Sequence, residues 1–179
     1  MSTSPETPSP WVARFATLPA RRGTALDVAA GGGRHTRLLR GLGYRVTAVD
    51  RDTSALEGMH GAEVVTADLE GPARPPVVTG PFDLVVVTRY LHRPLLPTLI
   101  GAVGADGALV YETFARGHER FGRPTNPDWL LRPGELLEVV RGQLRVVAYE
   151  DVVVDAPRPA ALQRIAAVRA GPGAPQGSS

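Results

Sequence analysis

The sequence predicts an α/β fold built on a mainly parallel sheet of seven strands, of which the last two form an antiparallel hairpin. Three observations lead to this prediction. Short apolar runs rich in Val, Leu and Ala alternate with segments of helical period, which is typical of parallel strands joined by crossover helices. A glycine cluster follows the first apolar run. Only the turn at 157–159 separates the last two runs, and so short a connection cannot make a parallel pair.

The first strand is predicted over Thr24–Ala29, ahead of the glycines at 31–33. Leucines between 38 and 42 then form one helical stripe, which Gly43 closes as a C-cap. The order of elements at the start of the domain is therefore strand, glycine loop and helix.

Two further strands each end at an aspartate. Arg45–Val49 stops at Asp50, and the weaker run Glu63–Ala67 stops at Asp68. Because ligands bind beyond the carboxyl ends of the strands in open α/β sheets, we expect both acids on the same rim as the glycine loop.

The middle of the chain holds the centre of the sheet. Phe82–Thr88 is almost wholly apolar, as expected for a strand covered on both faces. A helix is predicted over Pro94–Val103, with its proline near the N-terminus, and a fifth strand over Gly107–Phe114. The stretch Ala115–Arg132 has no clear period, and a connection of this length in a compact domain is more often functional than accidental.

The last third of the chain completes the sheet. Pro133 opens a helix that runs to Val140, and the strands Leu144–Val154 and Ala160–Ala170 make the hairpin. Residues 1–10 and 171–179 are rich in Ser, Pro and Gly and are predicted to be disordered tails. The prediction is thus a single domain over 11–170.

Composition excludes several kinds of chemistry. The 179 residues include no Cys, so thiol nucleophiles, iron–sulfur clusters and disulfides are impossible, and all 20 basic residues are Arg, so there is no catalytic lysine. The net charge of only +2 gives little reason to expect nucleic acid as a partner. No signal peptide or long apolar run is found, which favours a cytoplasmic protein without a membrane span; the sequence does not predict an oligomeric state. The four histidines lack metal-ligand spacing, so no metal site is expected.

The glycine loop and the two acids indicate a nucleoside-binding rim. Asp27 lies inside the first strand, and the glycines at its carboxyl end allow a ligand to approach the backbone. An acid that closes the second strand, here Asp50, can accept hydrogen bonds from ribose hydroxyls, and Asp68 is placed in the same way after the third strand. The alternatives are a plain strand-to-helix turn for the glycines and a helix N-cap for Asp50.

The pattern resembles the first motif of the class I S-adenosylmethionine-dependent methyltransferases, acid-x-Gly-x-Gly-x-Gly, with Ala29 in place of the first glycine. This family has a Rossmann-like, doubly wound sheet of seven strands that ends in the same antiparallel hairpin. The resemblance implies S-adenosyl-L-methionine as the cofactor, an acid on its ribose and an acid near its adenine. The cofactor-binding residues that it implies are Asp27, Ala29, Gly31, Gly33, Asp50, Arg51, Asp68, Leu69, Thr88 and Arg89.

Three longer stretches resemble a narrower group, the small bacterial methyltransferases related to the tellurite-resistance methyltransferase. These stretches are VTAVDRD, RYLHRPLL and YETFARGHERFGRPTNPDWLLRPGELL. The resemblance implies the type of reaction and leaves the substrate open.

Candidate catalytic residues follow the fourth strand, where the resembled fold closes over the methionine part of the cofactor. Tyr90 could contact the sulfonium region, and His92 could act as a base for a protonated acceptor. The alternative for His92 is a cap on the helix that starts at Pro94. Candidate substrate contacts are Arg93, Glu112 and Arg123, and the alternative for the long irregular stretch is an ordered loop stiffened by its prolines.

The predicted function is therefore methyl transfer to a small molecule by direct displacement. One alternative is a methyltransferase that acts on RNA or protein, with arginines 89, 93, 116, 120 and 123 as a basic surface, although the fourth-strand loop lacks an Asn-Pro-Pro-Tyr-like motif. Another alternative is a nucleoside-binding protein without catalytic activity.

Overall fold

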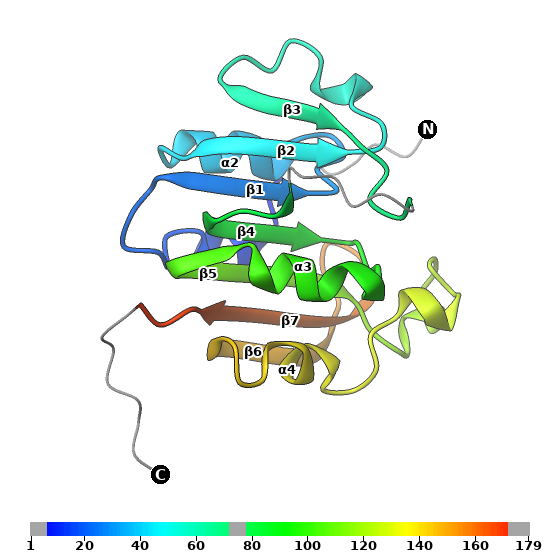
Figure 1. Cartoon of the computed structure of the whole chain (residues 1–179). Helices are drawn as coiled ribbons and strands as arrows, with labels where there is room; N and C mark the ends of the chain where they lie inside the picture. Colours follow the sequence, from blue (N-terminus) through cyan, green and yellow to red (C-terminus); the bar gives the residue numbers. More distant parts are fainter. Residues whose placement is uncertain (1–6, 72–77, 172–179) are drawn as a thin grey trace.

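A twisted sheet of seven strands runs through the computed structural model, which describes residues 7–71 and 78–171 (Figure 1). The strand order is β3-β2-β1-β4-β5-β7-β6. The first five strands in sequence pair in parallel, β7 is antiparallel to β5, and β6 is antiparallel to β7. The predicted fold class is confirmed, including the C-terminal hairpin.

The described helices and strands, in chain order, are α1 (Pro10–Phe15), β1 (Thr24–Val28), α2 (Arg34–Gly41), β2 (Arg45–Asp50), η1 (Ser54–Leu56), β3 (Ala62–Thr66), β4 (Phe82–Thr88), η3 (Arg93–Leu95), α3 (Leu96–Gly101), β5 (Val103–Phe114), η4 (His118–Arg120), η5 (Pro127–Trp129), α4 (Glu135–Val140), β6 (Arg145–Val154) and β7 (Ala160–Val168). The η elements are single 3-10 turns.

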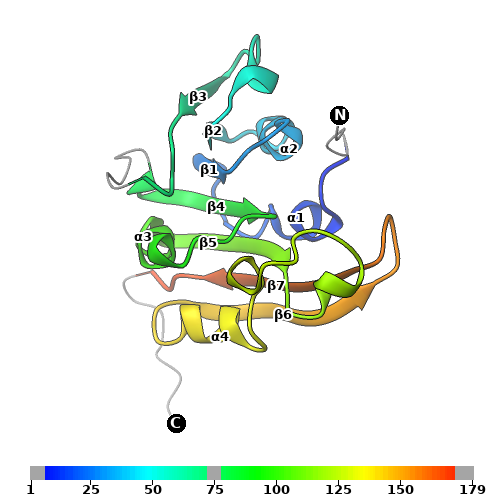
Figure 2. The same ribbon diagram turned by 90° about the vertical axis from the view of Figure 1, so that its right-hand side faces the viewer.

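Helices cover both faces of the sheet, with α1 and α2 on one side and α3 and α4 on the other (Figure 2). Successive residues of β4 alternate between the two layers, because side chains of a strand point to opposite faces. Leu84 and Val86 pack in the cluster that contains Trp11 and Leu39, and Val85 and Val87 pack in the other cluster. A strand buried on both faces explains why 82–88 is apolar at nearly every position.

The first helix changes the predicted start of the domain. Pro10 is the first residue of α1, and the Ser9 hydroxyl accepts hydrogen bonds from the backbone N–H groups of Trp11 and Val12. Ser9 is buried, so the predicted disordered tail was wrong for Ser9 and Pro10. Residues 1–6 and 172–179 of the two predicted tails lie outside the described residues.

The boundary between α3 and β5 also differs from the prediction. The helix ends at Gly101 and the strand begins at Val103, four residues before its predicted start at Gly107. Val103 pairs with Phe82 and Ala108 pairs with Leu84, so the residues between them form an irregularity in the ladder. The glycines and the aspartate in this bulge have the composition of a turn, which hides the start of the strand from the sequence.

Candidate functional site

The carboxyl ends of the parallel strands bring the predicted cofactor residues to one edge of the sheet, at the right of Figure 1. The backbone N–H of Gly31 donates to Oδ2 of Asp50 at 2.8 Å, which joins the glycine loop after β1 to the end of β2. The backbone N–H of Asp52 donates to Oδ1 of Asp50 at 3.0 Å. A carboxylate has lone pairs for about four hydrogen bonds, so Asp50 keeps acceptor sites for a ligand.

The glycine loop owes its shape to three residues with positive φ. Gly31 has φ +51°, and a Cβ atom there would meet nothing within 4 Å. Gly33 has φ +74°, a conformation that favours glycine, and a Cβ there would displace the side-chain ends of Met59 (2.5 Å) and Leu56 (2.6 Å). Ala29, where the family motif has glycine, adopts φ +54°. The backbone at Gly31 is therefore open to a ligand.

Asp27 lies beneath this loop with an unpartnered oxygen. The Thr36 hydroxyl donates to its Oδ2 at 2.6 Å, and Oδ1 is buried without a hydrogen-bond partner among the described residues. Burial raises the pKa of Asp27 to about 6, although the bond from Thr36 and the charge of Arg34 act against the rise. An orphaned buried acceptor at the carboxyl end of β1 fits a ligand that carries a hydrogen-bond donor.

Tyr90 follows the end of β4, on the edge of the sheet that carries the acidic residues. Its hydroxyl is buried and has no hydrogen-bond partner in the described chain. Burial raises the Tyr90 pKa well above its ordinary value of 10, and the charges of Glu70, Asp68 and Asp50 raise it further. The charges of the acids at the ends of β2 and β3 therefore act on Tyr90.

Other predicted cofactor residues take different positions on this edge. Asp68 is exposed to solvent on one side and accepts the Glu70 N–H at 2.9 Å, and Leu69 is buried in the core. Arg51 is exposed at the end of β2. Arg89 is exposed and holds φ +52°, a left-handed conformation that is uncommon for a side chain of this size and that occurs often at functional sites.

A buried histidine at the start of α2 anchors the edge from the other side. His35 accepts the backbone N–H of Ser9 at its Nε2 (3.1 Å), so Nδ1 carries the proton and donates to the Thr88 hydroxyl (3.2 Å). Burial lowers the His35 pKa to about 3, and the nearby Arg34 and Arg89 lower it further. The neutral ring is a structural link between the N-terminal segment, α2 and β4.

Glu112 extends this link, and both of its carboxylate oxygens accept hydrogen bonds. Its Oε1 accepts from the Ser9 hydroxyl at 2.8 Å, and its Oε2 accepts from Arg164 at 3.1 Å. The sequence could not reveal the role of Ser9, because it lies in a segment whose composition is that of a tail. The geometry supports a structural role for Glu112 in place of the predicted substrate contact.

Comparison with known proteins bears on what this edge binds. Residues 26–94 match a family model described as a methyltransferase domain. The match extends from β1 through the loop after β4, the part of the chain that holds the glycine loop, Asp50 and Tyr90. A search of curated proteins gave no match.

Several solved structures share the fold of this chain. TehB from Haemophilus influenzae has a TM-score of 0.72 and 15% identity, over 88% of this chain and 61% of TehB, so the chain spans less than two thirds of that protein. A TehB-like SAM-dependent methyltransferase from Corynebacterium glutamicum has a TM-score of 0.63 and 22% identity, over 89% of this chain and 87% of the other. 1,6-Didemethyltoxoflavin-N1-methyltransferase from Burkholderia thailandensis has a TM-score of 0.64 and 21% identity, over 90% of this chain and 77% of the other.

These comparisons confirm the predicted resemblance to the class I methyltransferases and to the TehB group. The structure from Corynebacterium glutamicum is that of a SAM-dependent methyltransferase, and the one from Burkholderia thailandensis holds S-adenosylhomocysteine. The unpartnered oxygen of Asp27 and the open backbone at Gly31 fit such a ligand, which carries an amino group and ribose hydroxyls as donors.

The candidate base His92 leaves its side chain without a hydrogen bond to any described residue. It is half-buried at the end of the β4 loop and makes no side-chain hydrogen bond to the 3-10 turn that follows it. Within the described residues its ring has no hydrogen-bond partner. The geometry therefore gives no support to the alternative that His92 caps the helix.

Arg93 forms hydrogen bonds that hold neighbouring segments together. Its Nε and Nη2 donate to the two carboxylate oxygens of Glu135, at 2.7 and 3.0 Å, and Nη2 also donates to the Leu130 carbonyl. These bonds tie the segment 115–132 to α4 and support a structural role in place of the predicted substrate contact. Arg123 is exposed, and its carbonyl accepts from His118 Nε2 at 3.1 Å.

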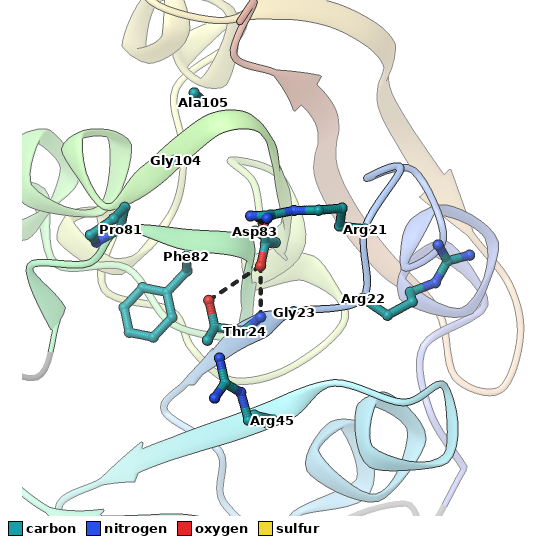
Figure 3. Close-up of a pocket in the computed structure, with 10 residues that line it drawn as sticks. All are labelled: Arg21, Arg22, Gly23, Thr24, Arg45, Pro81, Phe82, Asp83, Gly104 and Ala105. Carbon is teal, nitrogen blue, oxygen red and sulfur yellow. Dashed lines mark hydrogen bonds and ion pairs between the residues drawn. The ribbon is translucent and has the colours of Figure 1, made fainter.

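A hollow lies at the opposite edge of the sheet, where the parallel strands begin (Figure 3). At its centre Asp83 accepts from the backbone N–H of Thr24 at 2.7 Å and pairs with Arg21 at 2.9 Å. Open α/β sheets bind their ligands at the carboxyl ends of the strands, so the cofactor belongs at the other edge.

The described residues contain no group of three or more His, Asp or Glu side chains that could hold a metal ion. None of their helices is both long and apolar enough to cross a membrane.

Proposed function

We propose that this methyltransferase moves a methyl group from S-adenosyl-L-methionine directly to a small-molecule acceptor. The observation that carries the proposal is the contact between Gly31 and Asp50, which sets an open glycine backbone beside a ribose-binding carboxylate at the carboxyl edge of the sheet. The methyltransferase from Burkholderia thailandensis, solved with bound 1,6-didemethyltoxoflavin, gives a structural precedent for a small acceptor on this fold.

The cofactor is held by residues from four strand ends. Asp50 accepts hydrogen bonds from the ribose hydroxyls, and the free oxygen of Asp27 accepts one from the amino end. Asp68 and Leu69 flank the adenine, and Tyr90 closes the site from the end of β4. When bound, S-adenosyl-L-methionine supplies an electrophilic methyl group on a sulfonium, which an acceptor lone pair takes while the electron pair of the broken carbon–sulfur bond stays on sulfur.

The protein contributes position and one proton acceptor. Displacement of this kind gains most from alignment of the two reacting atoms at about 3–3.5 Å. His92, whose ring is free of hydrogen bonds in the described chain, takes the proton if the acceptor is a hydroxyl or a protonated amine. Arg93 and Glu112 hold the surrounding loops in place and do not touch the acceptor.

A thermal-shift experiment tests the cofactor assignment. S-adenosyl-L-methionine and S-adenosylhomocysteine should each raise the melting temperature, because a ligand at 100 times its Kd stabilises the folded chain by about 2.7 kcal/mol. NAD should have no effect. Asp50→Ala should abolish the shift, because it removes the acceptor of the ribose hydroxyls.

The matched control is Asp52→Ala, an exposed aspartate two residues further along the chain, whose shift should equal that of the wild type. If neither sulfur compound changes the melting temperature of the wild-type chain, the cofactor assignment fails. If Asp50→Ala keeps the shift, the ribose is bound elsewhere. Transfer of a labelled methyl group to metabolites in a cell extract tests the class of acceptor, and label found only in RNA or protein would contradict a small acceptor.

A further inference from the structure

A row of aromatic rings and guanidinium groups runs from the end of β4 into the segment 115–132. The Arg89 guanidinium lies 6.0 Å from the centre of the Phe114 ring, and the His118 ring stacks on that ring at 4.0 Å with an angle of 26°. Phe121 follows at 6.4 Å from His118, and Arg120 lies 5.6 Å from the centre of Phe121. We call Phe114, His118 and Phe121 the aromatic row.

The row is held next to the loop that carries the candidate catalytic residues. Arg93, in the turn after His92, donates to the carbonyls of Asp128 and Leu130, and Leu131 pairs with Ala115 beyond the end of β5. This edge faces the viewer in Figure 2, where the segment lies in front of the ends of β5 and β7. The turn that follows His92 is therefore fixed to the segment 115–132.

This surface carries an excess of free positive charge. Arg89, Arg116, Arg120 and Arg123 are all exposed, and none forms an ion pair with a described residue. The segment contains two acids, Glu119 and Asp128, and the Glu119 carboxylate already accepts the backbone N–H of Gly117. Four arginines against two acids leave a surface that attracts anions.

The same segment exposes two large aromatic side chains. Phe121 is 39% exposed and Trp129 is 56% exposed. Indole and phenyl rings that stay in water lose the free energy of burial, and beside arginines they form a surface that suits flat ligands. In contrast, the other tryptophan, Trp11, is buried in the core.

Positive charge and exposed aromatic rings thus occur on the same short segment, near His92 in the fold. The arginines can pair with an anionic group of a ligand, and the aromatic side chains can pack against its ring system. An inorganic oxyanion would use the charges alone and would leave Phe121 and Trp129 without a role.

We propose that the methyl acceptor is a small aromatic molecule that carries a carboxylate or a similar anionic group. The proposal rests on the proposed methyltransferase function and names its substrate class. The ring lies against the aromatic side chains of the segment, and Arg116 and Arg123 pair with the anion. This arrangement leaves the nucleophilic atom of the acceptor toward His92.

Calorimetry with two matched probes tests this substrate class. 1-Naphthoate and 1-naphthamide share one ring system and differ in charge. Titrated into the chain saturated with S-adenosylhomocysteine, 1-naphthoate should bind at least tenfold more tightly than 1-naphthamide. Arg116→Gln combined with Arg123→Gln should weaken 1-naphthoate at least tenfold and leave 1-naphthamide unchanged. Arg141→Gln, an exposed arginine after α4, is the control and should change neither affinity.

The outcomes separate the two proposals. Titration of S-adenosylhomocysteine alone comes first, and a failure there contradicts the proposed function. If the cofactor product binds but the two naphthalene probes bind equally, or neither binds, the substrate class is wrong and the methyltransferase function stands. If a single-stranded RNA binds instead, and the double variant abolishes that binding, the arginines serve a nucleic-acid acceptor and the proposal is overturned.

Discussion

Ala29 occupies a backbone conformation that glycine adopts more readily. Its φ of +54° places the Cβ atom near the carbonyl that follows, which costs about 1–2 kcal/mol for an L-residue. Ala29→Gly should remove this strain and lose about 0.5–1 kcal/mol through the greater freedom of the unfolded chain. We expect a net stabilisation of roughly 0.5–1 kcal/mol, measured by urea unfolding.

Ala30→Gly is the control for this prediction. Ala30 is buried next to the same loop and has no positive φ, so glycine there should destabilise the chain. If both variants lose stability to the same extent, the strain at Ala29 is absent in solution.

His35 should make folding stability depend on pH. Its pKa is about 3 in the folded chain against an ordinary 6.5, so the unfolded chain takes up a proton near pH 6.5 that the folded chain does not accept. Neutral His35 makes its full contribution to the free energy of unfolding above pH 6.5. This contribution falls by up to about 1.4 kcal/mol per pH unit as the pH decreases toward 3. His35→Gln should be less stable than the wild type at pH 7.5, by about 1–3 kcal/mol.

Urea unfolding of both proteins at pH 7.5, 6.5 and 5.5 checks this effect. The advantage of the wild type should shrink as the pH falls. Asp27, with its pKa of about 6, favours the folded chain as the pH falls below 6, but it is present in both proteins and cancels from the difference. A difference that stays constant over this range would show that His35 titrates normally in the folded chain.

At the scale of single residues, the sequence predicted the positions of residues that belong to a local motif. Asp27, Gly31 and Asp50 come together as expected because the ends of neighbouring parallel strands fix their distance. His35 and Ser9 could not be predicted, since their link joins residues 26 positions apart through a bond between a backbone N–H and a side chain, which leaves no periodic signal.

Among the elements, the segment 115–132 is the one whose position depends most on a single ion pair, that of Arg93 with Glu135. Glu135 is nearly buried and accepts from Arg93 on both oxygens. Burial alone would raise the Glu135 pKa, but the hydrogen bonds from Arg93 and Arg132 bring it down to about 2. Arg93→Met should therefore destabilise the chain by about 2–3 kcal/mol and increase hydrogen exchange at Leu131 and Arg116.

Arg141→Met is the matched control for this ion pair. Arg141 pairs with Glu138 at 3.5 Å, and both side chains are about three-quarters exposed, so its loss should change stability by less than about 1 kcal/mol. Equal effects of the two substitutions would mean that Arg93 does not hold the segment.

The elements themselves were predicted best where their apolar pattern is long. β4 has the predicted bounds, Phe82–Thr88, because a strand buried on both faces is apolar throughout. The helix predicted over Pro94–Val103 is instead a 3-10 turn followed by the short α3, and β5 takes its last residue. The two 3-10 turns in the segment 115–132 have no period of their own, so only tertiary contacts such as those of Arg93 define them.

For the whole molecule, topology followed from the connections. Long segments of helical period between the early strands require a parallel arrangement, and the short turn before β7 requires an antiparallel one. The sequence does not predict that α1 packs across the sheet onto β7, where Trp11 Nε1 donates to the Ile165 carbonyl at 3.2 Å. An N-terminal helix of six residues is too short to show a reliable period.

The place of β7 between β5 and β6 has a consequence for synthesis on the ribosome. β7 follows the other described strands in sequence, yet it forms both ladders that join β6 to the rest of the sheet, and it provides the carbonyl that holds Trp11 from 154 residues earlier. Until Ala160–Val168 leaves the exit tunnel, the nascent chain has an open edge at β5, and α1 lacks its hydrogen bond to β7. The sheet is therefore completed by a step in which the youngest of its described strands inserts between β5 and β6.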